Sequence, residues 1–99
     1  MEEQELIRKL NSVGKKIFVE YFFTFQSYAK GQLSRENCIE LLVTNKVSNA
    51  NGAAIRCGNA KLIFEAIMEC RALEIVTEST RLSYDIIDNA QKIIAEYYG

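Results

Sequence analysis

The segment Ser48–Met68, SNANGAAIRCGNAKLIFEAIM, is the most informative part of the sequence because it predicts a helix that other helices must surround. At 100° of rotation per residue, its apolar side chains cover about 240° of the helix circumference. Only Lys61, Glu65 and the following Glu69 form a narrow polar strip. A helix that is apolar on most sides is buried by its neighbours. We therefore expect this segment to be the central helix of the protein, with Ser48 as its N-cap.

Apolar residues keep helical spacing on both sides of this segment, and strand alternation is not sustained anywhere. The predicted neighbours are a first helix over Glu2–Lys30 that stops at Gly31, a second from Ser34 to about 44–46, a short segment over Ala72–Glu78, and a last helix from Ser83 to Gly99. Gly14, inside the first helix, predicts a kink or a close helix crossing. The expected fold class is all-α. Four to five helices form a compact bundle or an orthogonal array, in a single domain over residues 1–99.

The composition argues against an enzyme. The 99 residues contain no histidine, which removes the commonest general base and the commonest metal ligand. Ordinary serine and cysteine triads therefore have no base. The three cysteines, Cys38, Cys57 and Cys70, form no C-x-x-C pair and are expected to be small buried hydrophobes. We expect no enzymatic activity, no cofactor and no bound metal.

Charge and hydropathy predict the environment of the protein. The 12 basic and 13 acidic residues leave a net charge of −1, which gives no global field to attract a polyanion or an anionic membrane. No apolar run approaches the ~18 residues that a membrane crossing requires. The acidic start, MEEQELIRKL, predicts an amphipathic helix rather than a signal peptide. We expect a cytoplasmic protein with reduced thiols.

Residues 45–61 form a candidate polar recognition patch made of Asn49, Asn51, Arg56 and Asn59. Arg56 projects into the apolar arc, so it binds helix-terminal carbonyls or an acid such as Glu40, or it faces a partner. Asparagine, serine and arginine at a helix N-terminus are also typical of a surface that contacts phosphates and base edges. The alternative function is therefore a helix-turn-helix-like regulator that binds nucleic acid through residues 45–61.

The helix-turn-helix pattern is imperfect. The Val47–Ser48 step lies nine to ten residues after Cys38, whereas the standard motif places it five to six residues after its small buried residue. The net charge of residues 34–61 is only +2, which is low for phosphate binding.

A cluster of aromatic residues over 18–28 provides the candidate association surface. Five of its six aromatic side chains share the core face of the first predicted helix, but Phe23 points about 170° away and Val19 joins it one turn earlier. Another helix of the domain covers this pair, or the pair binds a partner, or it is simply exposed. Tyr97 and Tyr98 are further candidates for a core edge or an interface. We predict a small non-enzymatic interaction or regulatory protein that binds another protein through Val19 and Phe23, with a homodimer as one form of this contact.

Overall fold

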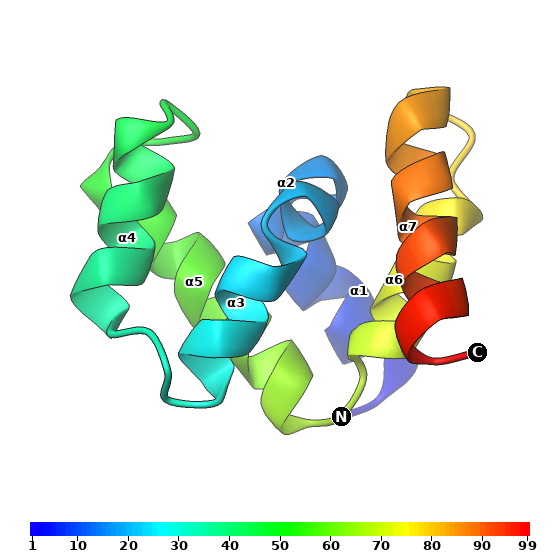
Figure 1. Ribbon diagram of the computed structural model, residues 1–99, viewed down its shortest axis with the longest axis horizontal. Helices are drawn as coiled ribbons and strands as arrows, with labels where there is room; N and C mark the ends of the chain where they lie inside the picture. Colours follow the sequence, from blue (N-terminus) through cyan, green and yellow to red (C-terminus); the bar gives the residue numbers. More distant parts are fainter.

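The computed structural model describes all 99 residues, and the chain is all-helical as predicted. It contains seven helices rather than the predicted four to five (Figure 1). They are α1 (Glu3–Val13), α2 (Lys15–Glu20), α3 (Phe22–Ala29), α4 (Arg35–Thr44), α5 (Ala50–Glu65), α6 (Glu69–Thr77) and α7 (Tyr84–Tyr97).

The larger number of helices results mainly from two breaks in the predicted first helix. Gly14 has a φ of +91°, which is accessible to glycine and strained for other residues, so α1 ends there and the predicted kink is confirmed. The second break is at Tyr21, whose φ is −111° and ψ is 22°. Backbone hydrogen bonds from Tyr21 to Ile17 and from Phe25 to Tyr21 continue across this break. The break is therefore a change of direction between α2 and α3, and the chain remains helical on both sides.

Side-chain caps fix two of the helix starts. The Ser34 hydroxyl accepts a hydrogen bond from the backbone N–H of Asn37 at 3.1 Å, which confirms the predicted N-cap of α4. The prediction that Ser48 caps α5 is wrong. Asn49 is the N-cap, and its Oδ1 accepts from the Gly52 N–H at 2.8 Å. Ser83 occupies the predicted N-cap position of α7 but makes no side-chain capping bond.

Three helices end with the same pair of backbone hydrogen bonds. After α3, α4 and α5 one residue adopts positive φ, and these residues are Gly31, Lys46 and Ile67. In α5, Ile67 N–H donates to the Phe64 carbonyl and Met68 N–H to the Ile63 carbonyl. The ends of α3 and α4 have the same 5→2 and 6→1 spacing, which is the Schellman motif.

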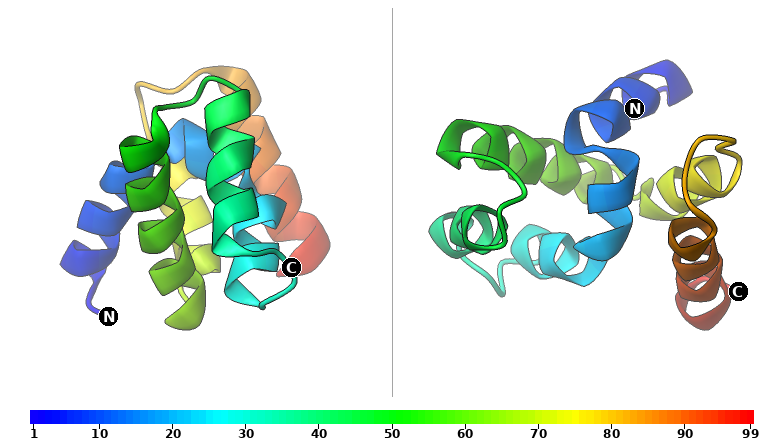
Figure 2. Two further views of the ribbon diagram at one scale, coloured as in Figure 1. Left: turned by 90° about the vertical axis from the view of Figure 1, so that its left-hand side faces the viewer. Right: turned by 90° about the horizontal axis from the view of Figure 1, so that it is seen from above.

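Helix α5 packs against α1, α3, α4 and α6, so the predicted central helix is confirmed by its neighbours. Helix α4 lies at one edge of the molecule and the α6–α7 pair at the opposite edge (Figures 1 and 2). One side of α5 is less covered than predicted, because Ile55 and Leu62 are exposed. The molecule measures 31 × 26 × 25 Å.

The core consists of hydrophobic side chains alone. Its 20 buried residues include no polar or charged side chain. The Phe18 ring lies at its aromatic centre, with centroids 5.6 Å from Phe22, 6.4 Å from Phe25 and 5.9 Å from Phe64. The core position predicted for these aromatics of α2 and α3 is thus confirmed. None of the helices combines the length and the apolar character needed to cross a membrane.

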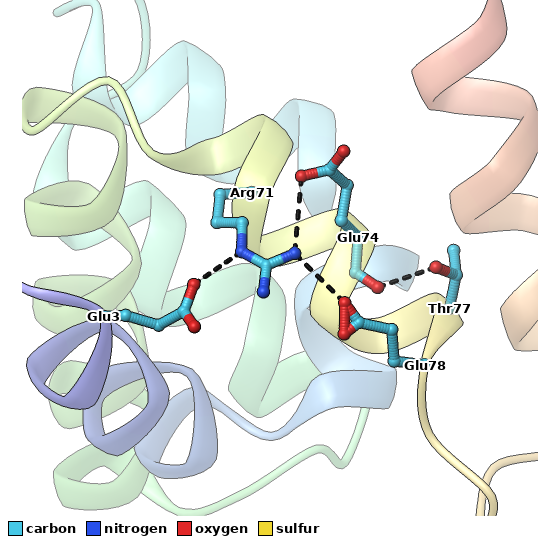
Figure 3. A network of polar contacts seen from close by, with 5 residues as sticks. All are labelled: Glu3, Arg71, Glu74, Thr77 and Glu78. Atoms are coloured by element: carbon cyan, nitrogen blue, oxygen red, sulfur yellow. Dashed lines mark hydrogen bonds and ion pairs between the residues drawn. The ribbon is translucent and has the colours of Figure 1, made fainter.

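An arginine joins the start of the chain to α6 through ion pairs (Figure 3). Arg71 Nε lies 2.6 Å from a carboxylate oxygen of Glu3, and Arg71 Nη1 lies 3.0 Å from Glu78 and 3.5 Å from Glu74. This network ties α1 to α6 at the surface, across 68 residues of sequence.

Candidate functional site

The structure separates the two residues of the predicted association surface. Val19 is only 5% exposed, which fits the alternative that another helix of the domain covers it. It belongs to α2, which packs against α7, so a helix of the same domain covers it. Phe23 belongs to α3, beyond the break at Tyr21. The prediction assumed one continuous helix, and the change of direction removes the shared face.

Phe23 remains accessible and forms an aromatic pair with α7. Its side chain is 43% exposed, and its ring centroid lies 5.1 Å from that of Tyr97, which is 61% exposed. On its inner side, the Phe23 ring contacts the buried Phe22 with centroids 5.2 Å apart. A surface pair of aromatic rings supported from within by a core ring is a rigid apolar feature.

A depression of about 350 Å³ opens beside this pair, where α3, α5, the start of α6 and the end of α7 meet. Three aromatic side chains line it, from Phe64, Tyr97 and Tyr98. Two carboxylates, Glu65 and Glu69, line it as well, and Lys30 lies among the remaining lining residues. Tyr97 belongs to both the pair and the depression, so the two are continuous. We call the surface made of Phe23, Phe64, Tyr97, Tyr98, Glu65 and Glu69 the aromatic face.

Glu69 is the polar group of the aromatic face with an unused acceptor. Its Oε2 accepts a hydrogen bond from the Tyr98 hydroxyl at 3.1 Å, while its Oε1 is buried and has no partner in the protein. Burial, and then the hydrogen bond to the Glu69 carboxylate, raise the pKa of Tyr98, so this hydroxyl stays protonated as the donor. A buried acceptor without a donor costs about 1–3 kcal/mol. Glu69 also lines the depression, so a movement of its side chain would present this acceptor to a donor that enters with a ligand.

The four residues of the predicted polar recognition patch have different local roles. Asn49 is the N-cap of α5, and Asn51 is exposed two residues later. Asn59 donates to the Ile55 carbonyl at 3.1 Å and lines a separate polar hollow with residues of α1. Asn49 and Asn59 thus make hydrogen bonds to backbone groups of α5, and the single recognition patch stays a prediction.

Arg56 is held inside the fold. Its Nη1 donates to the Val13 carbonyl at the C-terminal end of α1, so of the alternatives weighed for this residue the helix-terminal carbonyl is confirmed. The Val13 carbonyl is available because α1 stops at Gly14. A second cation of the 34–61 segment, Lys61, lies over the Tyr28 ring, 5.0 Å from its centroid. Two of the four cations that a nucleic-acid interface would use are thus engaged within the molecule.

The sequence did not predict Glu69 as a functional residue. It lies on the polar strip of the central segment, where solvation was the simpler expectation. Its proximity to Tyr98 depends on the bend at Ile67 and on the return of α7, and neither contact has a local sequence pattern. Tyr97 and Tyr98 were candidates for a core edge or an interface, and Tyr98 lies half-buried against the core while Tyr97 faces outward.

Comparison of the chain with family models, with curated proteins and with solved structures finds no match.

Proposed function

We propose that this is a non-enzymatic binding protein whose aromatic face receives a basic side chain of a protein partner. The observation that carries the proposal is the Glu69 carboxylate, which has one oxygen unpartnered and buried beside the tyrosines of the depression. A guanidinium or ammonium group supplies the donors that this oxygen lacks.

The rest of the aromatic face suits the same ligand. Aromatic ring faces attract cations, and the rings of Tyr97 and Tyr98 line the depression together with the carboxylate of Glu65. Two carboxylates against the single cation Lys30 leave the depression negative. Its volume is at the lower end of the range for binding pockets, so it suits one side chain rather than a large ligand.

Phe23 adds apolar area to the aromatic face. Its ring and that of Tyr97 are partly exposed, and aromatic side chains of this kind commonly anchor protein interfaces. The expected partner segment therefore carries a lysine or arginine next to a large apolar residue. Recognition combines an apolar anchor on Phe23 with a charge-assisted hydrogen bond to Glu69.

The test uses random peptides displayed on phage and selected on the purified protein. We expect enrichment of sequences with Lys or Arg beside a large apolar residue. Synthetic versions of these peptides should bind Phe23→Ala and Glu69→Gln about tenfold more weakly or worse. Tyr84→Ala and Glu20→Gln are the matched controls, because both side chains are exposed and lie outside the aromatic face. They should leave binding unchanged.

Two results would overturn the proposal. One is enrichment of peptides without a basic residue, and the other is equal binding to the wild type and to Glu69→Gln. Self-association through the same face is a separate outcome. A wild-type mass that doubles with concentration, together with a monomeric Phe23→Glu, would replace the basic partner by a second copy of this chain.

A further inference from the structure

Two of the three cysteines meet where α4 packs on α5. Cys38 of α4 and Cys57 of α5 are both buried, as predicted for small hydrophobes, and both are free thiols. Their Sγ atoms lie 3.0 Å apart. The third cysteine, Cys70 in α6, is half-buried and does not take part in this contact.

A covalent bond between these two sulfurs needs only a small movement. A disulfide has an S–S distance of about 2.05 Å, so the atoms must approach by roughly 1 Å. The residues are 19 positions apart, and they belong to different helices that already pack together. We propose that Cys38 and Cys57 form a reversible disulfide on exposure to hydrogen peroxide, and that this bond fastens α4 to α5.

The hydrogen bond between the thiols sets the order of events. With Cys38 as donor to Cys57, this bond raises the pKa of Cys38 and lowers the pKa of Cys57. The nearby guanidinium of Arg35 lowers the pKa of Cys57 further. Burial raises the pKa of both thiols, so it adds to the effect on Cys38 and opposes the lowering at Cys57. In this arrangement Cys57 is the thiol that loses its proton more easily and reacts first, and Cys38 is the resolving thiol.

The chemistry balances with peroxide as the only oxidant. The Cys57 thiolate attacks one peroxide oxygen, the O–O bond breaks, and the departing hydroxide leaves as water after taking up a proton. Cys57 is then a sulfenic acid. The Cys38 sulfur attacks the Cys57 sulfur, an S–S bond forms, and the sulfenic oxygen leaves as a second water with the Cys38 proton. Two thiols lose two electrons, and one peroxide is reduced to two waters.

The position of α4 gives the oxidant a route. Helix α4 lies at the edge of the molecule and packs mainly on α5 and α3 (Figures 1 and 2). An edge helix with few neighbours opens locally at a lower cost than the central α5. Such openings admit a molecule as small as peroxide without unfolding the rest of the core.

The experiment treats Cys70→Ser with hydrogen peroxide under native conditions and measures intact mass and free thiols after denaturation. We expect both remaining thiols to disappear, with a mass decrease of about 2 Da that dithiothreitol reverses. The matched variant Cys38→Ala/Cys70→Ser retains Cys57 alone. It should give a sulfenic acid that dimedone traps. Peptide mapping of the oxidised wild type should find Cys38 linked to Cys57, which covers the case in which a variant fails to fold.

Stability provides the second readout. The closed loop restricts the unfolded chain, so the oxidised form should melt roughly 10 °C above the reduced form. Retention of both thiols, or a gain of oxygen without loss of hydrogen, would overturn the proposal. A linked form that melts no higher than the reduced form would contradict the fastening of α4.

Discussion

Gly14 adopts a backbone conformation that ends α1, and it leaves room for the side chain of Arg56, which is far away in the sequence. Its positive φ ends α1 and leaves the Val13 carbonyl available to Arg56. A Cβ atom added at Gly14 would lie 2.9 Å from Arg56 Nη1, so a larger residue would also disturb the arginine. The sequence alone left open whether Arg56 binds a helix-terminal carbonyl, an acid or a partner. The packing of α5 against α1 decides this, because it determines which groups lie near the guanidinium.

Gly14→Ala should lower the free energy of unfolding by about 2 kcal/mol or more, because alanine is strained at this φ and meets the Arg56 guanidinium. Gly58→Ala is the control within α5. Its new Cβ would meet nothing within 4 Å, and its backbone is helical. This variant should gain up to about 1 kcal/mol. Urea denaturation of the two variants checks the difference, and equal effects would contradict the role given to Gly14.

At the scale of the elements, the helix ends explain why chain direction was harder to predict than helix content. Apolar spacing identifies helical residues, but it runs without interruption through Tyr21, where α2 and α3 diverge. The Schellman end at Gly31 has the expected glycine. The ends at Lys46 and Ile67 place ordinary residues at positive φ, so tertiary packing overrides the local preference there. Likewise, Ser48 and Asn49 are both good caps, and local sequence does not choose between them.

Ile67→Gly should raise the free energy of unfolding by about 1 kcal/mol, because a β-branched residue is strained in the left-handed region. The isoleucine side chain is 84% exposed, so its removal takes little from the core. Gly31→Ala is the reverse experiment at φ +77°, with no atom within 4 Å of the added Cβ, and should lose stability through backbone strain alone. Thermal unfolding measures both. A loss of stability in Ile67→Gly would mean that this side chain contributes to packing.

At the scale of the whole molecule, the sequence predicted an all-helical fold around the 48–68 segment, and the structure confirms both. The aromatic face was not predictable as a unit, because it requires α3, α5, α6 and α7 to converge. Phe23, Tyr97 and Glu69 are far apart in the chain, and no periodic pattern relates one to another. Helix crossing angles bring them together, and these depend on side-chain packing over the entire core.

The Glu3–Arg71 ion pair should make the attachment of α1 to α6 depend on pH. The hydrogen bond from Arg71, and then its charge, lower the pKa of Glu3 below its usual 4.5. The stabilisation is therefore complete above the unfolded pKa and is lost as pH falls through the lower, folded value. The Tm of Glu3→Gln should lie slightly below that of the wild type at pH 7, and this gap should close as the pH falls through the lowered folded pKa of Glu3. High salt should narrow the gap at pH 7, because both side chains are solvated.

Glu40→Gln is the control, because this exposed carboxylate makes no ion pair. The difference in Tm between Glu40→Gln and the wild type should not change with pH. The difference between Glu3→Gln and the wild type should disappear over the same pH range. A gap for Glu3→Gln that does not narrow at all as the pH falls below 4.5 would show that the ion pair is not its source.

The packing of α1 on α5 also determines the order in which the chain can fold during synthesis. Leu6, Leu10 and Val13 are buried, but the helix that covers them ends at Glu65. At ribosomal rates of about 5–20 residues per second, the first helix waits roughly 3 to 10 s for its partner. During that interval its apolar side is open to chaperones and to other nascent chains. Helix α1 is thus translated before α5 and docks late.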